Sequence, residues 1–89
     1  MYLHLGQSVV IPFREVIGIF DLDNTTSSHI TRNFLSRAEQ EGRVVNVSED
    51  LPKSFALCRD GSGGVTIYIS QLSSVTLLKR AENGSFDLR

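Results

Sequence analysis

The sequence predicts a small α+β domain: a mostly antiparallel sheet of five to six short strands, with one main helix and a short C-terminal helix. Three observations favour this class. The chain has 89 residues, too few for two independent domains, and it is 40% hydrophobic and 21% charged, as globular proteins are. Short β-branched runs alternate with Gly and Pro breaks around one amphipathic stretch. We expect one domain over residues 1–80 and a mobile tail over residues 81–89.

The first third of the chain has the character of strands. Residues 2–5 and 9–11 form two short apolar runs on either side of a Gly-containing break, which predicts a hairpin. Pro12 lacks an amide donor and should end the second strand. A third run, residues 16–20, is almost continuously apolar, and Gly18 within it indicates close packing against the backbone.

A helix is the strongest prediction for the middle of the chain. It should begin between residues 26 and 28, where Thr and Ser side chains can cap its first amides, and end at Gly42, which tolerates left-handed backbone angles. Ile30, Phe34 and Ala38 recur every four residues and form one apolar stripe.

The second half returns to strands. Two of the predicted strands flank a glycine-rich segment, residues 60–64, which we interpret as a hairpin turn rather than a phosphate-binding loop, because no helix follows it. Leu72, Val75 and Leu77 or Leu78 should face inward from the last helix. The predicted elements are strands over residues 44–47, 54–59 and 65–69, and a short helix from residue 70 or 73 to residue 80.

Composition excludes several classes of function. The formal net charge is -1, and one cysteine, Cys58, cannot form an internal disulfide. No paired Cys/His spacing suggests a metal site, and we predict no cofactor. No apolar run approaches the roughly 20 residues that span a bilayer, and no signal peptide is visible. We therefore expect a cytoplasmic protein with no membrane partner.

Self-association is expected from the size of the chain. A domain this short buries a marginal core, and a run such as residues 16–20 needs cover on both faces. We expect a homo-oligomer, with a marginal monomer as the alternative.

One local pattern resembles an enzyme motif. Residues 20–25, Phe-Asp-Leu-Asp-Asn-Thr, are similar to the first motif of haloacid-dehalogenase-type phosphohydrolases, in which two aspartates hold Mg²⁺ and one attacks phosphorus. This interpretation assigns those roles to Asp21 and Asp23. A turn and helix cap explain the same residues without chemistry, and we favour that explanation.

The basic residues balance the acidic ones: residues 1–80 hold eight of each. Arg14 lies between the second and third predicted strands, Arg32 in the helix and Lys53 in a loop. Solvated surface charge is the simpler interpretation, but an oligomer could align one such residue from each copy into a track for DNA phosphates.

The order of elements resembles a known family. Residues 2–6, 9–11 and 14–21, followed by a single helix closing at Gly42, are similar to the RemA/RemB-type bacterial extracellular matrix regulators, and more to the RemB branch. The resemblance implies a LytTR-like fold and a non-enzymatic transcriptional regulator of biofilm genes. It also implies a ring that holds double-stranded DNA by its backbone, with Arg14, Arg32 and Lys53 as the DNA-binding residues.

Two alternatives stay open at this point. The first is a ring- or dimer-forming module that binds a protein or a ligand but no DNA, because the basic loop around Lys53 is thin and the chain carries no excess positive charge. The second is the Mg²⁺-dependent phosphohydrolase that would use Asp21 and Asp23.

Overall fold

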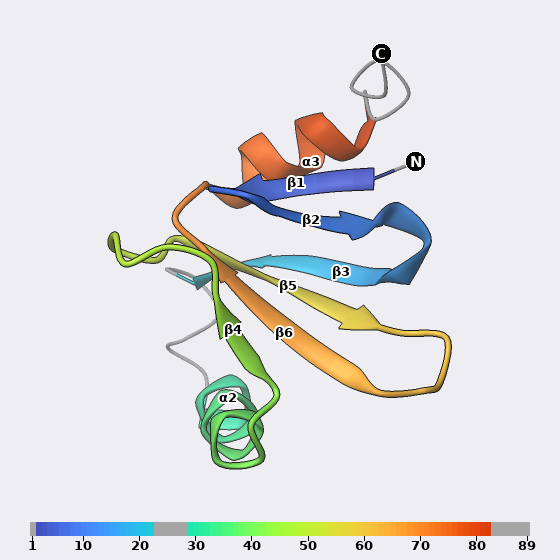
Figure 1. Ribbon diagram of the computed structural model, residues 1–89. Helices are drawn as coiled ribbons and strands as arrows, with labels where there is room; N and C mark the ends of the chain where they lie inside the picture. The colour runs from blue at the N-terminus through green and yellow to red at the C-terminus, as the bar shows by residue number, and fades with distance from the viewer. Residues whose placement is uncertain (1, 23–28, 83–89) are drawn as a thin grey trace.

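A four-stranded sheet forms the centre of the molecule in a computed structural model, which describes residues 2–22 and 29–82. Its strands, in spatial order, are β3 (Val16–Asp21), β5 (Ser54–Arg59), β6 (Val65–Ser70) and β4 (Val44–Asn46) (Figure 1). Neighbouring strands are antiparallel except β4, which runs parallel to β6. Helix α2 (His29–Gln40) lies between β3 and β4 in the chain and carries it across the sheet, so the predicted α+β class is confirmed.

The first two strands form a layer of their own. β1 (Tyr2–Gly6) and β2 (Val9–Pro12) make the predicted hairpin, but they pair only with each other and not with the central sheet. The single sheet expected from the sequence is thus two sheets. The physical reason is the junction: Pro12 cannot donate to a ladder, and the 3-10 turn η1 (Phe13–Glu15) redirects the chain before β3 begins.

The hairpin and the last helix cover one face of the sheet. α3 (Ser74–Glu82) begins after Ser73, whose hydroxyl accepts a hydrogen bond from the Thr76 amide at 3.1 Å. The main core on this face joins the hairpin, the sheet and α3, and consists of Leu3, Leu5, Ile11, Val47, Ala56, Cys58 and Leu77. The hairpin and α3 therefore cover this face of the sheet within a single chain.

Leu77 is the residue of α3 that points inward. Its relative exposure is 0%, whereas Leu78 is 46% and Val75 is 59% exposed, so the prediction of an inward Val75 is wrong. The helix also extends beyond the predicted end at residue 80, to Glu82. Residues 83–89, most of the expected tail, lie outside the described residues.

Two buried serines connect these layers. The Ser70 hydroxyl donates to the Leu5 carbonyl at 2.7 Å and accepts from the Leu72 amide at 3.0 Å. The Ser54 hydroxyl donates to the Leu72 carbonyl at 2.7 Å. Both serines have 0% relative exposure, so these bonds satisfy the hydroxyl groups that water does not reach.

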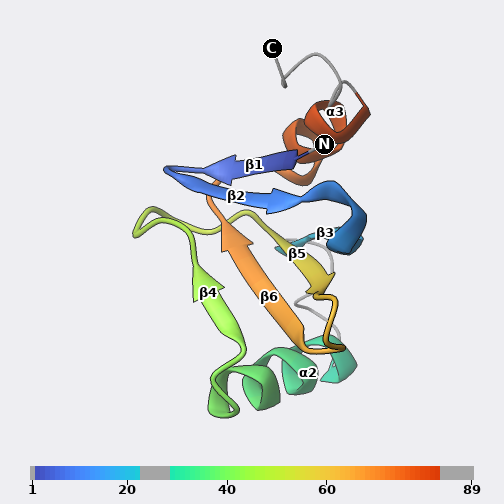
Figure 2. The same cartoon turned by 45° about the vertical axis from the view of Figure 1, so that its right-hand side comes forward.

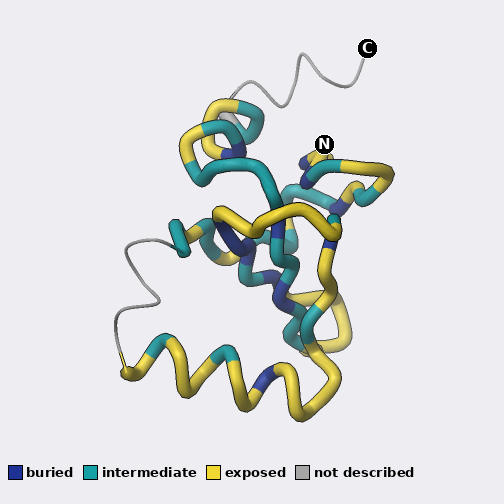
Figure 3. Tube along the Cα trace, turned by 90° about the vertical axis from the view of Figure 1, so that its left-hand side faces the viewer, coloured by how far each residue is buried: buried dark blue, intermediate teal, exposed yellow. Residues whose placement is uncertain are grey.

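Helix α2 covers the opposite face only in part. It ends as predicted, because Gly42 has a φ of +74°. The Gly42 amide donates a hydrogen bond to the Glu39 carbonyl, and the Arg43 amide donates one to the Ala38 carbonyl. The predicted start between residues 26 and 28 lies outside the described residues. Figures 2 and 3 show α2 at one end of the molecule, with exposed residues along most of its length. Neither α2 nor α3 is long and apolar enough to cross a membrane.

The apolar stripe of α2 is only half used within one chain. Ala38 is buried and packs with Phe55 and Ile67 of the sheet. Ile30 is 81% and Phe34 is 43% exposed, because the first half of the helix does not lie over the sheet. The sequence pattern identified the stripe correctly but could not say how far it is covered.

Candidate nucleic-acid interface

Arg14 lies in the short turn that links the hairpin to the central sheet. It belongs to η1, directly before β3, and its side chain is exposed. Within residues 2–22 and 29–82 no carboxylate lies at ion-pair distance from it. A guanidinium in this position is available for a phosphate oxygen, which it can bind with two parallel hydrogen bonds.

Arg32 and Lys53 are also exposed, on other elements. Arg32 projects from α2, and its Nη2 lies 3.2 Å from Nδ1 of His29. Lys53 directly precedes β5, and its backbone is fixed: its amide donates to the Ser70 carbonyl at 2.9 Å, and its carbonyl accepts from the Leu22 amide at 3.0 Å. The position of Lys53 is therefore set by the sheet.

The three predicted residues do not come together in one chain. Arg14 precedes β3, whose first residue, Val16, pairs with Cys58 near the end of β5. Lys53 precedes β5, whose first residue pairs with Asp21 at the far end of β3. A strand of six residues spans about 17–20 Å, so Arg14 and Lys53 lie at opposite ends of the same strand pair. Any continuous basic track has to be built from several copies.

Two further arginines lie at the end of the sheet that holds Arg14. Arg59 ends β5 opposite Val65, the first residue of β6, and Arg43 immediately precedes β4. The β4–β6 register pairs Val44 with Ile67, which brings Arg43 to this same end. Sequence reasoning missed this group because the residues are far apart in the chain, and only the strand order brings them to one end.

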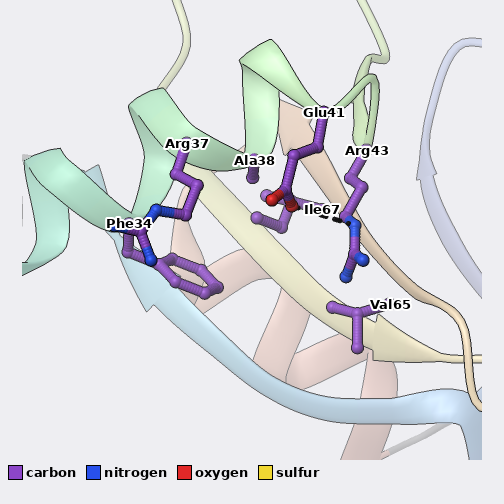
Figure 4. A pocket seen from close by; sticks show the side chains of 7 residues that line it. All are labelled: Phe34, Arg37, Ala38, Glu41, Arg43, Val65 and Ile67. Carbon is purple, nitrogen blue, oxygen red and sulfur yellow. Dashed lines mark ion pairs between the residues drawn. The ribbon is translucent and has the colours of Figure 1, made fainter.

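A groove between α2 and the sheet lies beside these arginines. A small cavity of about 50 Å³ has apolar residues on its floor and charged residues at its rim (Figure 4). A wider hollow of about 310 Å³ adjoins it, and the two share Phe34 and Arg37. At the rim, Nε of Arg43 forms an ion pair with Oε1 of Glu41 at 3.2 Å. The lining of the small cavity comprises Phe34, Arg37, Ala38, Glu41, Arg43, Val65 and Ile67.

The glycine-rich segment is a turn, as predicted. Oδ1 of Asp60 accepts hydrogen bonds from the Ser62 amide and hydroxyl and from the Gly64 amide. These bonds stabilise the carboxylate and lower the pKa of Asp60, with the Ser62 hydroxyl as the largest cause. The carboxylate thus holds the β5–β6 turn together.

The described residues do not form the metal site that the phosphohydrolase interpretation requires. Asp21 ends β3 at its pairing with Ser54, while Asp23 lies outside the described residues. Among residues 2–22 and 29–82, no three His, Cys, Asp or Glu side chains gather in a way that would hold a metal ion.

Cys58 contributes a pH dependence of stability. Burial raises the pKa of its thiol from 9.0 to about 11, and the charge of Glu15 adds to the effect. Because the folded pKa lies above the ordinary value, the folded state favours the protonated thiol. Its contribution is complete below pH 9 and is lost as the pH rises from 9 towards 11, to a total of about 2–3 kcal/mol.

We therefore expect the free energy of unfolding to fall between pH 9 and 11. Urea titrations at each pH measure this decline, and Cys58→Ala should flatten it. An equal decline in the alanine variant would show that other groups cause it.

The chain is 39% identical over 82 residues to Extracellular matrix regulatory protein B of Bacillus subtilis, a match that covers 92% of this chain and 91% of that protein. No protein-family profile matches the chain. The aligned region includes most of the helices and strands described above.

Proposed function

The chain belongs to the RemA/RemB-type family of extracellular matrix regulatory proteins, and from that premise we propose that it is a non-enzymatic transcriptional regulator that binds the backbone of double-stranded DNA. In this proposal several copies assemble into a ring in the cytoplasm. Arg14 is the principal phosphate contact of each copy, and Arg32 and Lys53 add to it.

Uncovered apolar side chains support the assembly. Ile17 and Phe20 on the edge strand β3, and Ile30 and Phe34 on α2, are all substantially exposed in the single chain. Phe20 stacks on Phe55, with ring centroids 5.1 Å apart, so it lies on the sheet face that α2 covers only in part. Exposed apolar groups of this size are typical of surfaces that contact another protein.

The observation that carries DNA binding is the position of Arg14. It is exposed, it has no carboxylate partner in the described part of the chain, and it occupies a short turn whose place is set by strands on both sides. One such contact gives weak affinity, whereas the same contact repeated around a ring gives many along one duplex. Bending the duplex costs several kcal/mol, at most about 10 kcal/mol for a site of 20–30 base pairs, which repeated contacts can offset.

Two measurements on the wild-type protein test this proposal. Light scattering should give the mass of a closed oligomer. Fluorescence anisotropy with a random-sequence duplex should then show binding whose log K falls linearly with log[salt]. A single-chain mass would refute the ring, and a flat salt response would refute phosphate contacts.

A second function is favoured by the surroundings of Lys53. Glu49 and Asp50 lie close to it in the same loop, so the local charge is negative rather than positive. If the assembled protein shows no affinity for duplex DNA, the molecule is a ring- or dimer-forming module for a protein or ligand.

A further inference from the structure

We propose that the acidic loop of one copy, residues 48–52, docks in the groove between α2 and the sheet of the next copy. In this contact the Leu51 side chain enters the apolar floor of the groove, and Glu49 and Asp50 pair with arginines at its rim. The inference rests on the proposed assembly and specifies the surfaces that form it.

The groove suits an acidic segment with one apolar side chain. Its floor is apolar, formed by Phe34, Ala38, Val65 and Ile67. Two arginines, Arg37 and Arg43, line it. A third, Arg59, is the cross-strand partner of Val65 and so lies on the same face of the sheet, next to the lining. Among the described lining residues Glu41 is the one carboxylate, and it already pairs with Arg43. The rim therefore has an excess of positive charge.

The loop has the complementary composition. Leu51 is 79% exposed, so a partner that covers it gains the free energy of burying an apolar side chain, and Glu49 and Asp50 directly precede it. Both ends of the loop are fixed to β6, because the Val47 amide donates to the Ile69 carbonyl and the Lys53 amide donates to the Ser70 carbonyl, each at 2.9 Å. Fixed ends reduce the entropy that the loop loses on binding.

The two surfaces cannot meet within one chain. The groove lies where β6 begins, at Val65, whereas both loop ends are bonded near its last residue, Ser70. Six residues of strand separate these ends by about 17 Å. Figure 2 shows the same separation: the loop that follows β4 lies at the opposite end of β4 and β6 from α2. Docking must then join the loop of one copy to the groove of another, a head-to-tail contact that closes into a ring when the rotation per copy permits.

Docking also brings together basic residues that one chain keeps apart. Lys53 follows the loop directly, and Arg14 lies at the same end of the sheet as the groove. When the loop docks, Lys53 of one copy moves to the end of the neighbouring sheet that holds Arg14. The contact thereby supplies the repeated track that DNA binding requires.

Charge reversal with mixing tests the contact. The loop variant carries Glu49→Arg and Asp50→Arg, and the groove variant carries Arg37→Glu and Arg59→Glu, which leaves the Glu41–Arg43 ion pair intact. Each variant alone should sediment as single chains at a concentration where wild type is assembled. An equimolar mixture should form oligomers again, because every contact between alternating copies of the two variants is complementary, and recovery also shows that both variants are folded.

Matched controls separate the contributions of charged and apolar side chains to assembly. Glu39→Arg makes a comparable change on α2 outside the groove lining and should leave the assembled mass unchanged. Leu51→Ser should weaken assembly at least tenfold, whereas Val75→Ser, at another exposed apolar position, should not.

The outcomes distinguish this inference from the proposed function. A loop variant that assembles like wild type, or a mixture that stays dissociated, would overturn the docking while the regulator proposal stands. A wild-type protein that sediments as single chains would overturn both.

Discussion

Replacing Arg14 with alanine should lower the affinity of the assembled protein for duplex DNA by at least about tenfold, with folding and assembly unchanged. The side chain is exposed and lacks an ion-pair partner in the described part of the chain, so its removal costs no internal contact. In a ring, the phosphate contact is lost in every copy that faces the duplex. A total loss of about 1.4 kcal/mol of binding free energy is enough to lower the affinity tenfold. The slope of log K against log[salt] should become shallower as well.

Fluorescence anisotropy titrations at three or more salt concentrations measure both changes. The matched control is Lys79→Ala, which removes one positive charge from α3 instead. If the two variants lose the same affinity, net charge matters and the position of Arg14 does not. If Arg14→Ala binds like wild type, Arg14 is not part of the interface.

Replacing Leu77 with alanine should destabilise the protein by about 2–5 kcal/mol, a large share of the roughly 5–15 kcal/mol that holds a domain folded. Leu77 has 0% relative exposure and is the residue by which α3 enters the main core with Leu3, Leu5 and Cys58. The substitution leaves a cavity there, because β1 and β3, which pack against α3, are held in their own strand pairs and cannot move in to fill it.

The adjacent leucine provides the control. Leu78→Ala changes the same atoms on the same helix at a position that is 46% exposed, so it should cost less than about 1 kcal/mol. Thermal unfolding at one fixed protein concentration compares the two, since assembly itself raises the melting temperature. Equal losses in the two variants would mean that α3 does not pack as described.

Local sequence signals predicted the elements well. The helix stops before Gly42 because that residue takes a left-handed φ, and the 60–64 turn forms because the Asp60 carboxylate accepts hydrogen bonds from its amides. Both are short-range effects that a few consecutive residues determine.

The arrangement of those elements could not be predicted in the same way. The residues around 44–46 do not indicate that β4 pairs in parallel with β6. Residues 2–12 likewise do not indicate that the hairpin stays outside the central sheet. These outcomes depend on contacts between distant segments. Arg14 could therefore be predicted as a candidate from the sequence. That Arg59 and Arg43 lie at the same end of the sheet as Arg14 could not be predicted, because it depends on the strand order.

The bond between the Ser70 hydroxyl and the Leu5 carbonyl has a consequence for biosynthesis. Besides its hairpin partner β2, strand β1 packs against Ser70 and Leu77, which lie more than sixty residues later in the chain. Because translation adds about 5–20 residues per second, Leu3 and Leu5 wait several seconds for these later partners in each nascent polypeptide. A ribosome that stalls before α3 emerges would leave Leu3 and Leu5 without Leu77, so this part of the core would stay accessible to chaperones and proteases.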